Sequence, residues 1–292
     1  MKISIIATLV LGSSIAGWPS AASPPTADPP SSAPATTIPT TSPETRSRAA
    51  GWGDRSWSDQ HEDGRRFLRE SEHPDGADLV LLGDSITQSF GGEGRRTGQP
   101  GRASLRRHLP GIVIANQGIS GDRTQHLLWR LGNDALAGRR PAVISVLIGT
   151  NNVPHDEPEA IAAGTARILE TIRTLAPESV ILLHAIPPRG VEPDDPLRAR
   201  VARTTELTRR LATTSTIRWI DPWKSLLDPE GRPIPGRLAA DGVHLGRDGY
   251  DLWARVLAAE LAGIEKERPR ERSGPREHGD RPGRPPAAGS TR

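Results

Sequence analysis

The chain of 292 residues contains no cysteine, one tyrosine and two phenylalanines. The absence of cysteine excludes disulfide bonds and the attachment of a lipid to a cysteine. Flavin sites usually place aromatic side chains beside the ring, so the scarcity of tyrosine and phenylalanine argues against a flavodoxin-like flavin-binding protein. A long apolar run is also missing, because the run at residues 3–16 is too short for a comfortable transmembrane helix.

The two ends of the chain differ in composition from its middle. Residues 1–22 combine Lys2, a short apolar run and a small-residue cleavage site, which is typical of a signal peptide and predicts export to the cell surface, periplasm or medium. Residues 23–51 are rich in Pro, Ser, Thr and Ala, and residues 265–292 in Pro, Gly, Arg and Glu. Neither segment can bury enough apolar surface to offset its ordering entropy, so we predict a disordered linker, one folded domain at residues 52–264 and a disordered basic tail. An uncleaved N-terminal anchor stays open as the alternative to a signal peptide.

The net positive charge of the chain comes from this tail. Residues 265–292 hold eight Lys or Arg and five Asp or Glu, which accounts for the whole formal net charge of +3. The rest of the chain is therefore neutral overall, and it shows neither the clustered basic charge nor the aromatic platforms that nucleic-acid binding requires. We expect no nucleic-acid partner.

Short apolar runs alternate with amphipathic segments in the middle of the chain. Near-continuous apolar runs are typical of parallel strands that are covered on both faces. The predicted strands are residues 79–83, 112–115, 142–148, 180–183 and 217–220, and the predicted helices are residues 59–72, 102–108, 124–136, 158–175, 196–212 and 247–262. This alternation predicts an α/β fold with a central parallel sheet of about five strands and helices on both faces.

Small or polar residues follow three of these strands, and two more polar residues precede the last helix. Ser85 follows the first strand, Gly118 the second and Asn151 the third, while Asp241 and His244 lie just before the last helix. Because open α/β sheets bind ligands at the carboxyl ends of their strands, we expect all five residues to meet at one edge of the sheet. Each pattern also occurs for structural reasons alone, as a polar turn, a helix cap or a glycine with an unusual φ angle.

These residue types are the ones that acyl transfer requires. A serine is a weak nucleophile that needs an adjacent base, and His244 is the candidate base for Ser85. Asp241 can accept a hydrogen bond from the other ring nitrogen of His244 and fix its tautomer. The backbone N–H groups of Ser85 and Gly118 and the side-chain amide of Asn151 are candidate donors to an oxyanion.

The motifs around these residues resemble the four sequence blocks of the SGNH (GDSL-type) hydrolases. The matching segments are GDSIT at residues 83–87, NQGISGD at residues 116–122, GTNN at residues 149–152 and DGVH at residues 241–244. Within that family the chain is most similar to the platelet-activating-factor acetylhydrolase catalytic subunits and their bacterial relatives. This closer resemblance rests on TQHLLWRL at residues 124–131, PRG at residues 188–190 and DPLR at residues 195–198.

The resemblance covers residues 57–261 and implies a three-layer flavodoxin-like fold. It also implies serine ester hydrolysis without a metal or another cofactor, with Ser85 as nucleophile, Asp241 and His244 completing the triad, and Gly118 and Asn151 as oxyanion donors.

The segment at residues 90–107 is rich in Gly and Arg and does not resemble its counterpart in that branch, which leaves the substrate open. The loops beside the expected site are polar, whereas an enzyme acting on long chains at a membrane needs exposed apolar surface. We therefore predict an exported serine esterase that removes short acyl groups, above all acetyl, from a carbohydrate or another polar alcohol. Its expected partner is a small-molecule or glycan ester, with no stable membrane insertion after signal cleavage. A homodimer, a lysophospholipase- or lipase-like esterase and a non-catalytic glycan-binding module of the same fold stay open.

Overall fold

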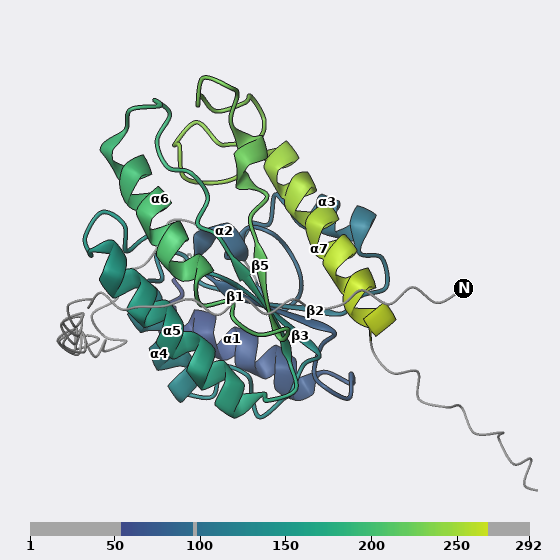
Figure 1. Ribbon diagram of the computed structural model, residues 1–292. Helices are drawn as coiled ribbons and strands as arrows, with labels where there is room; N and C mark the ends of the chain where they lie inside the picture. The colour runs from purple at the N-terminus through teal and green to yellow at the C-terminus, as the bar shows by residue number, and fades with distance from the viewer. Residues whose placement is uncertain (1–53, 96–97, 268–292) are drawn as a thin grey trace, which may run out of the picture. The chain divides into compact units, whose positions relative to one another are not determined.

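The computed structural model describes residues 54–95 and 98–267 (Figure 1). The predicted signal peptide and linker, and all but the first residues of the basic tail, lie outside the described residues. The described part contains five strands in one parallel sheet with the order β2-β1-β3-β4-β5. They are β1 (Leu79–Gly83), β2 (Ile114–Gly118), β3 (Val143–Leu147), β4 (Val180–His184) and β5 (Ile217–Ile220). The predicted α/β fold with a central parallel sheet is confirmed.

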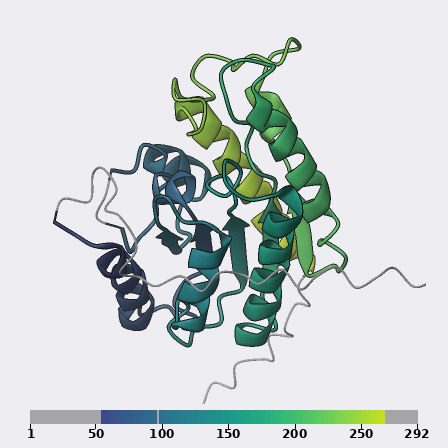
Figure 2. The ribbon, with the colours of Figure 1, turned by 90° about the vertical axis from the view of Figure 1, so that its left-hand side faces the viewer.

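The side chains of β1 alternate between two apolar cores. Leu79 and Leu81 pack in a cluster with side chains of α3 (Arg102–His108) and α7 (Arg247–Glu267). Val80 and Leu82 pack on the other face, in a cluster with side chains of three further helices. These are α1 (Trp57–Glu70), α4 (Thr124–Gly132) and α5 (Pro158–Leu175), with α6 (Pro196–Arg209) packed against α5. Figures 1 and 2 show the two sets of helices on opposite sides of the sheet, so both faces of β1 are buried and its sequence is apolar throughout.

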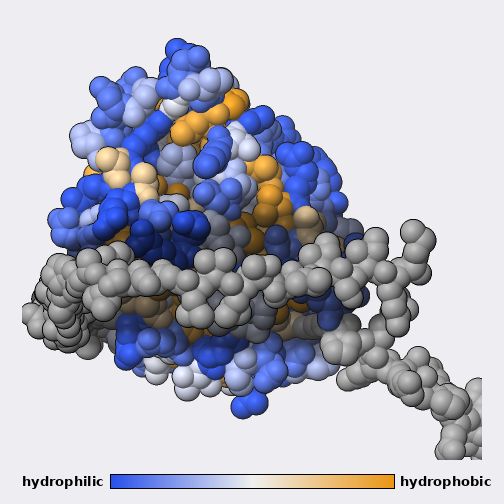
Figure 3. All heavy atoms as spheres, viewed as in Figure 1, coloured by the Kyte–Doolittle hydropathy of each residue, from blue (hydrophilic) through white to orange (hydrophobic). Residues whose placement is uncertain are grey.

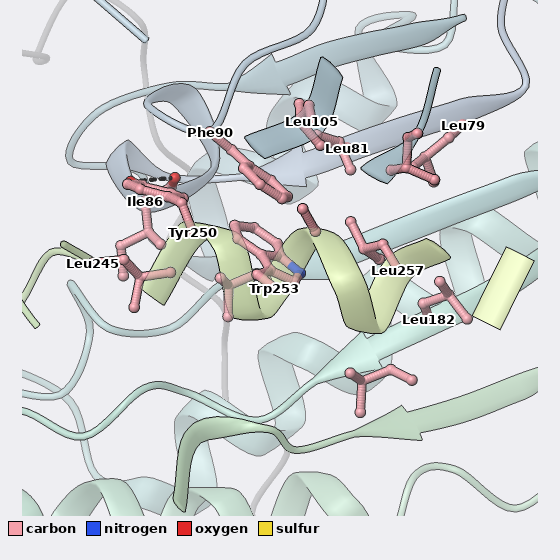
Figure 4. Packing of buried hydrophobic residues seen from close by; sticks show 14 of the residues in the cluster. Leu79, Leu81, Ile86, Phe90, Leu105, Leu182, Leu245, Tyr250, Trp253 and Leu257 are labelled. Atoms are coloured by element: carbon pink, nitrogen blue, oxygen red, sulfur yellow. Dashed lines mark hydrogen bonds between the residues drawn. The ribbon is translucent and has the colours of Figure 1, made fainter. Parts of the chain in front are cut away.

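Helix α7 supports the segment that follows β1. The ring of Phe90 stacks on Trp253, with 4.1 Å between centroids, and on Tyr250, with 5.5 Å between centroids (Figure 4). The Tyr250 hydroxyl donates a hydrogen bond of 3.0 Å to the carbonyl of Ile86, which belongs to the short helix α2 (Ser85–Gln88). Burial raises the pKa of Tyr250, so the phenol stays a neutral donor. The last helix of the domain therefore holds the first turn after β1 in place.

Strand β2 extends further than the sequence predicts. The prediction ended this strand at Ala115 and placed the following Asn-Gln-Gly in a loop, because those residues are not apolar. In the structure the strand continues to Gly118, which pairs with Gly83 of β1. Asn116 is fully buried, and its side-chain amide donates to the carbonyl of Thr87 at 2.8 Å. A polar side chain can occupy a buried strand position when its polar atoms are hydrogen-bonded in this way.

The helices differ from the predicted ranges mainly at their ends. Helix α1 begins at Trp57, earlier than predicted, because Ser56 and Asp59 form a capping box that satisfies the first N–H groups. Helix α4 ends at Gly132 and α6 at Arg209, both earlier than predicted. Helix α7 continues to Glu267, past the predicted domain end at residue 264. Across the described residues, none of the helices has the length and apolarity needed to cross a membrane.

Candidate active site

Ser85 is the first residue of α2 and directly follows Asp84 at the end of β1. Ser85 follows the first strand as the sequence predicts, and it is half-buried at the start of a helix. The Asp84 side chain caps this helix by accepting the N–H of Ile86 at 3.0 Å. The first N–H groups of a helix have no intrahelical acceptor, so the N–H of Ser85 is available to a ligand. Asp84 itself is fully buried, and desolvation raises its pKa to about 7 against the opposing hydrogen bond from Ile86.

His244 and Asp241 meet Ser85 from a turn that precedes α7. The Oγ of Ser85 lies 2.8 Å from Nε2 of His244, and Nδ1 of His244 lies 2.7 Å from Oδ2 of Asp241. The other carboxylate oxygen of Asp241 accepts the backbone N–H groups of Val243 and His244, each at 2.9 Å. This hydrogen-bond network assigns the ring proton of His244 to Nδ1, which donates to Asp241. The lone pair of Nε2 then faces the hydroxyl of Ser85.

The hydrogen bonds around Asp241 favour its ionised form. Partial burial acts to raise its pKa, but the bonds from the backbone and side chain of His244 and from the backbone of Val243 outweigh burial, and the pKa of Asp241 lies below its ordinary value. The side chain of Asp241 remains 51% exposed and that of His244 39% exposed. The base and its carboxylate partner are therefore open to solvent.

Asn151 lies in the loop after β3 and is fixed against the loop after β2. Its Nδ2 donates a hydrogen bond of 2.9 Å to the backbone carbonyl of Asp122. A side-chain amide carries two N–H bonds, so the second one is left for another acceptor. The hydrogen bond to Asp122 therefore holds Asn151 beside the loop that follows β2.

The structure does not present the N–H of Gly118 to the site, and this part of the prediction is corrected. That N–H donates to Oδ1 of Asn116 at 2.8 Å, because Gly118 is still inside the strand. A Cβ atom at Gly118 would lie 2.3 Å from the backbone nitrogen of Gln88 and 2.8 Å from the carbonyl oxygen of Asp84. Glycine at this position therefore serves the close approach of β2 to α2.

A loop after β4 joins the two halves of the site. Nη1 of Arg189 donates to the carbonyl of Thr150 at 2.9 Å, next to Asn151. The N–H of Gly190 donates to the carbonyl of Gly242 at 2.8 Å, within the turn that carries His244. The Pro-Arg-Gly segment thus connects the loop after β3 to the turn before α7.

Asp122 has a different place from the one its sequence position suggests. Although Asp122 lies close to the start of the following helix, Arg123 is the N-cap of α4. The side chain of Asp122 is instead fully buried and paired with Arg130 and Trp57. Spacing along the chain could not show this, because Trp57 lies on α1, far away in the sequence.

The chain also matches a known family. The model of the GDSL-like lipase/acylhydrolase family matches residues 81–252, a range that contains Ser85, Asp241 and His244. The chain belongs to this family. The resemblance seen in the sequence is confirmed, and as a GDSL-type acylhydrolase the chain is an esterase.

Relatives and solved structures agree with this membership. The chain is 31% identical over 211 residues to platelet-activating factor acetylhydrolase IB subunit alpha1 of Rattus norvegicus, covering 72% of this chain and 84% of the relative. It is 30% identical over 222 residues to subunit alpha2 of Homo sapiens, covering 75% and 90%.

Two solved structures share the fold of this GDSL domain. A GDSL-like lipase from Bacteroides thetaiotaomicron superimposes with a TM-score of 0.54 at 16% identity, covering 70% of this chain and 98% of that one. An acetyl xylan esterase from Geobacillus stearothermophilus gives a TM-score of 0.52 at 23% identity, covering 64% and 94%. The three-layer SGNH fold is therefore confirmed.

Proposed function

We propose that the protein is an exported serine esterase that removes short acyl groups, above all acetyl, from a carbohydrate or another polar alcohol. The observation that carries the proposal is the unbroken chain of hydrogen bonds from Ser85 through His244 to Asp241. It supports catalysis rather than a non-catalytic glycan-binding role, because each atom already has the partner that acyl transfer needs.

In the proposed reaction Ser85 Oγ attacks the ester carbonyl while its proton moves to Nε2 of His244. The carbonyl electrons move to oxygen and give a tetrahedral oxyanion, and ionised Asp241 stabilises the imidazolium. Collapse breaks the bond to the alcohol, which leaves with the proton from Nε2. Water then attacks the carbonyl of the acyl-serine and gives a proton to Nε2 of His244. Collapse of this second oxyanion releases the acid, and Ser85 Oγ leaves with the proton from Nε2.

Three N–H groups are proposed as donors to the oxyanion. Ser85 contributes the free N–H at the start of α2, and Asn151 contributes the amide N–H that Asp122 does not use. Gly121 replaces Gly118 as the third donor. Among the described residues the N–H of Gly121 has no hydrogen-bond acceptor, and Gly121 directly precedes Asp122 with a φ of 76°.

The short acyl group is proposed from the surface and from the relatives. Only two large hydrophobic residues of the described chain are exposed, Leu175 and Val191. Hydrophilic side chains predominate on the face drawn in Figure 3, which is unlike a surface that docks on lipid. The relatives named above are subunits of platelet-activating factor acetylhydrolase, and one structural neighbour is an acetyl xylan esterase.

The mechanism and the acyl length are tested together with p-nitrophenyl esters of increasing chain length. We expect Ser85→Ala to abolish hydrolysis while the protein keeps its fold. Among acetate, butyrate, octanoate and palmitate, kcat/KM should fall steeply beyond butyrate, and acetylated sugars and xylan fragments should also be substrates. Wild-type rates in folded Ser85→Ala protein would refute the serine mechanism, and a kcat/KM that rises toward octanoate would favour a lipase.

Export is tested on the full chain in a bacterial host. Mass spectrometry of the protein recovered outside the cytoplasm should show a mature N-terminus close to Ala22. An intact Met1 on protein that stays in the cytoplasm would refute export.

A further inference from the structure

A fully buried ion pair lies behind the proposed oxyanion site. Asp122 and Arg130 are both 0% exposed, and Nη2 of Arg130 lies 2.8 Å from Oδ2 of Asp122. Nε of Arg130 donates to the same carboxylate oxygen at 2.9 Å. The other oxygen, Oδ1, accepts Nε1–H of Trp57 at 2.7 Å. Both oxygens of this buried carboxylate are therefore bonded to side chains from α1 and α4.

The guanidinium of Arg130 also binds the ends of two strands. Its Nη1 donates to the carbonyl of Gln117 in β2 at 2.8 Å, and its Nη2 donates to the carbonyl of Gly83 in β1 at 3.2 Å. Gly83 is separated from Ser85 only by Asp84. One planar guanidinium thus connects the end of β1, two residues before Ser85, with the loop that carries Asp122.

The backbone of Asp122 transmits this arrangement to Asn151. The Asp122 carbonyl accepts a hydrogen bond of 2.9 Å from the side-chain amide of Asn151. The side chain of Asp122 is fixed by Trp57 and Arg130, so its carbonyl has a fixed position relative to Gly83 and hence to Ser85. A side-chain donor to an oxyanion is effective only when its place is set before the reaction.

Stability alone does not explain why the pair is there. Removing two charges from water is costly, and apolar residues of the same volume often serve stability as well or better. A buried pair is better explained when its directional hydrogen bonds specify a geometry that apolar packing would leave loose. Here Arg130 donates to the carbonyls of two strands, and the backbone carbonyl of its partner Asp122 accepts the side-chain amide of Asn151.

We propose that Arg130, Asp122 and Trp57 are positioning residues that set the place of the Asn151 amide relative to Ser85. The proposal rests on the proposed serine mechanism and adds to it residues that touch neither substrate nor reacting atoms. The chemistry they support is the stabilisation of the oxyanion in the acylation and deacylation steps.

The test is a double-mutant cycle measured as kcat and KM on p-nitrophenyl acetate. Trp57→Phe removes one hydrogen bond to Asp122 and keeps an aromatic ring, while Arg130→Lys keeps the charge but cannot reach all four acceptor contacts. Each variant is made alone and in the Asn151→Ala background. Trp223→Phe is the matched control, since Nε1–H of Trp223 is a buried donor to the carbonyl of Ala185, which directly follows β4.

We expect Trp57→Phe and Arg130→Lys each to lower kcat by about tenfold with KM unchanged, because small displacements of a catalytic group are costly. In the Asn151→Ala background the same substitutions should change kcat by less than about twofold, because the group they position is gone. Trp223→Phe should leave kcat within about twofold of wild type.

Equal reductions of kcat in both backgrounds, or wild-type kcat in folded Trp57→Phe, would overturn the proposal. Circular dichroism establishes folding; if Arg130→Lys fails to fold, Trp57→Phe decides alone because it leaves the ion pair intact. The proposed serine mechanism has a separate readout: it fails if Ser85→Ala is active, whereas an inactive Ser85→Ala with an additive cycle refutes only the positioning role.

Discussion

The turn that holds Asp241 predicts that an asparagine there is more damaging to catalysis than an alanine. One carboxylate oxygen accepts two backbone N–H groups, from Val243 and His244, and the other accepts Nδ1–H of His244. In Asp241→Asn the side-chain amide oxygen must face the two backbone N–H groups, because the reverse orientation would point the amide NH₂ group at these two donors. The NH₂ group then faces His244 and can only donate to Nδ1.

This orientation forces His244 into the wrong tautomer. With Nδ1 as acceptor the ring proton moves to Nε2, which then cannot take the proton of Ser85. We expect kcat to fall by about 10⁴-fold, a loss of about 5.5 kcal/mol of transition-state stabilisation. In Asp241→Ala the imidazole is free to adopt either tautomer, and both side chains are open enough for water to replace the carboxylate. Asp241→Ala should therefore keep at least about tenfold more kcat than Asp241→Asn.

The melting temperatures of the two variants should follow the opposite order, with Asp241→Asn more stable than Asp241→Ala. Asparagine keeps the acceptor for the two backbone N–H groups of the turn, whereas alanine leaves both to water. Steady-state kinetics on p-nitrophenyl acetate and thermal unfolding of the same samples measure both orders. If Asp241→Asn is as active as Asp241→Ala or more so, the tautomer argument is wrong and another group orients His244.

Three further predictions concern single residues. Asn151→Ala should lower kcat by about 10²–10³-fold with little change in KM on p-nitrophenyl acetate, and a change in KM alone would place Asn151 in substrate binding instead. Gly118→Ala should lower the melting temperature, because its Cβ would lie 2.3 Å from the nitrogen of Gln88; an unchanged melting temperature would contradict that close approach. The folded pKa of about 7 for Asp84 lies above its ordinary 3.8, so the folded state keeps a proton that the unfolded chain releases, and the Asp84 contribution to stability falls as pH rises through this window. Asp84→Asn should therefore raise the melting temperature relative to wild type more at pH 8 than at pH 4, by a free energy of at most about 4 kcal/mol, and an equal difference at both pH values would refute the raised pKa.

The sequence by itself determined the sheet and most of the triad. Four of the apolar runs lie on strands close to the predicted ranges, since a strand buried on both faces has to be apolar along its length. Ser85 and His244 could be chosen without coordinates because the chain places them after the first strand and before the last helix. Parallel strands bring such positions to one edge, and the structure finds the two side chains 2.8 Å apart.

Only the tertiary structure decided which polar groups are left free to act. Apolar periodicity ended β2 too early because Asn116 is buried and polar, with its partners on the segment after Ser85. The side-chain oxygen of the same asparagine accepts the N–H of Gly118, which no spacing in the sequence reveals. Likewise the pairing of Trp57 and Arg130 with Asp122 joins residues of separate elements. Local pattern predicts where apolar surface is buried, but a buried polar group is satisfied by whatever the fold brings beside it, and that depends on long-range packing.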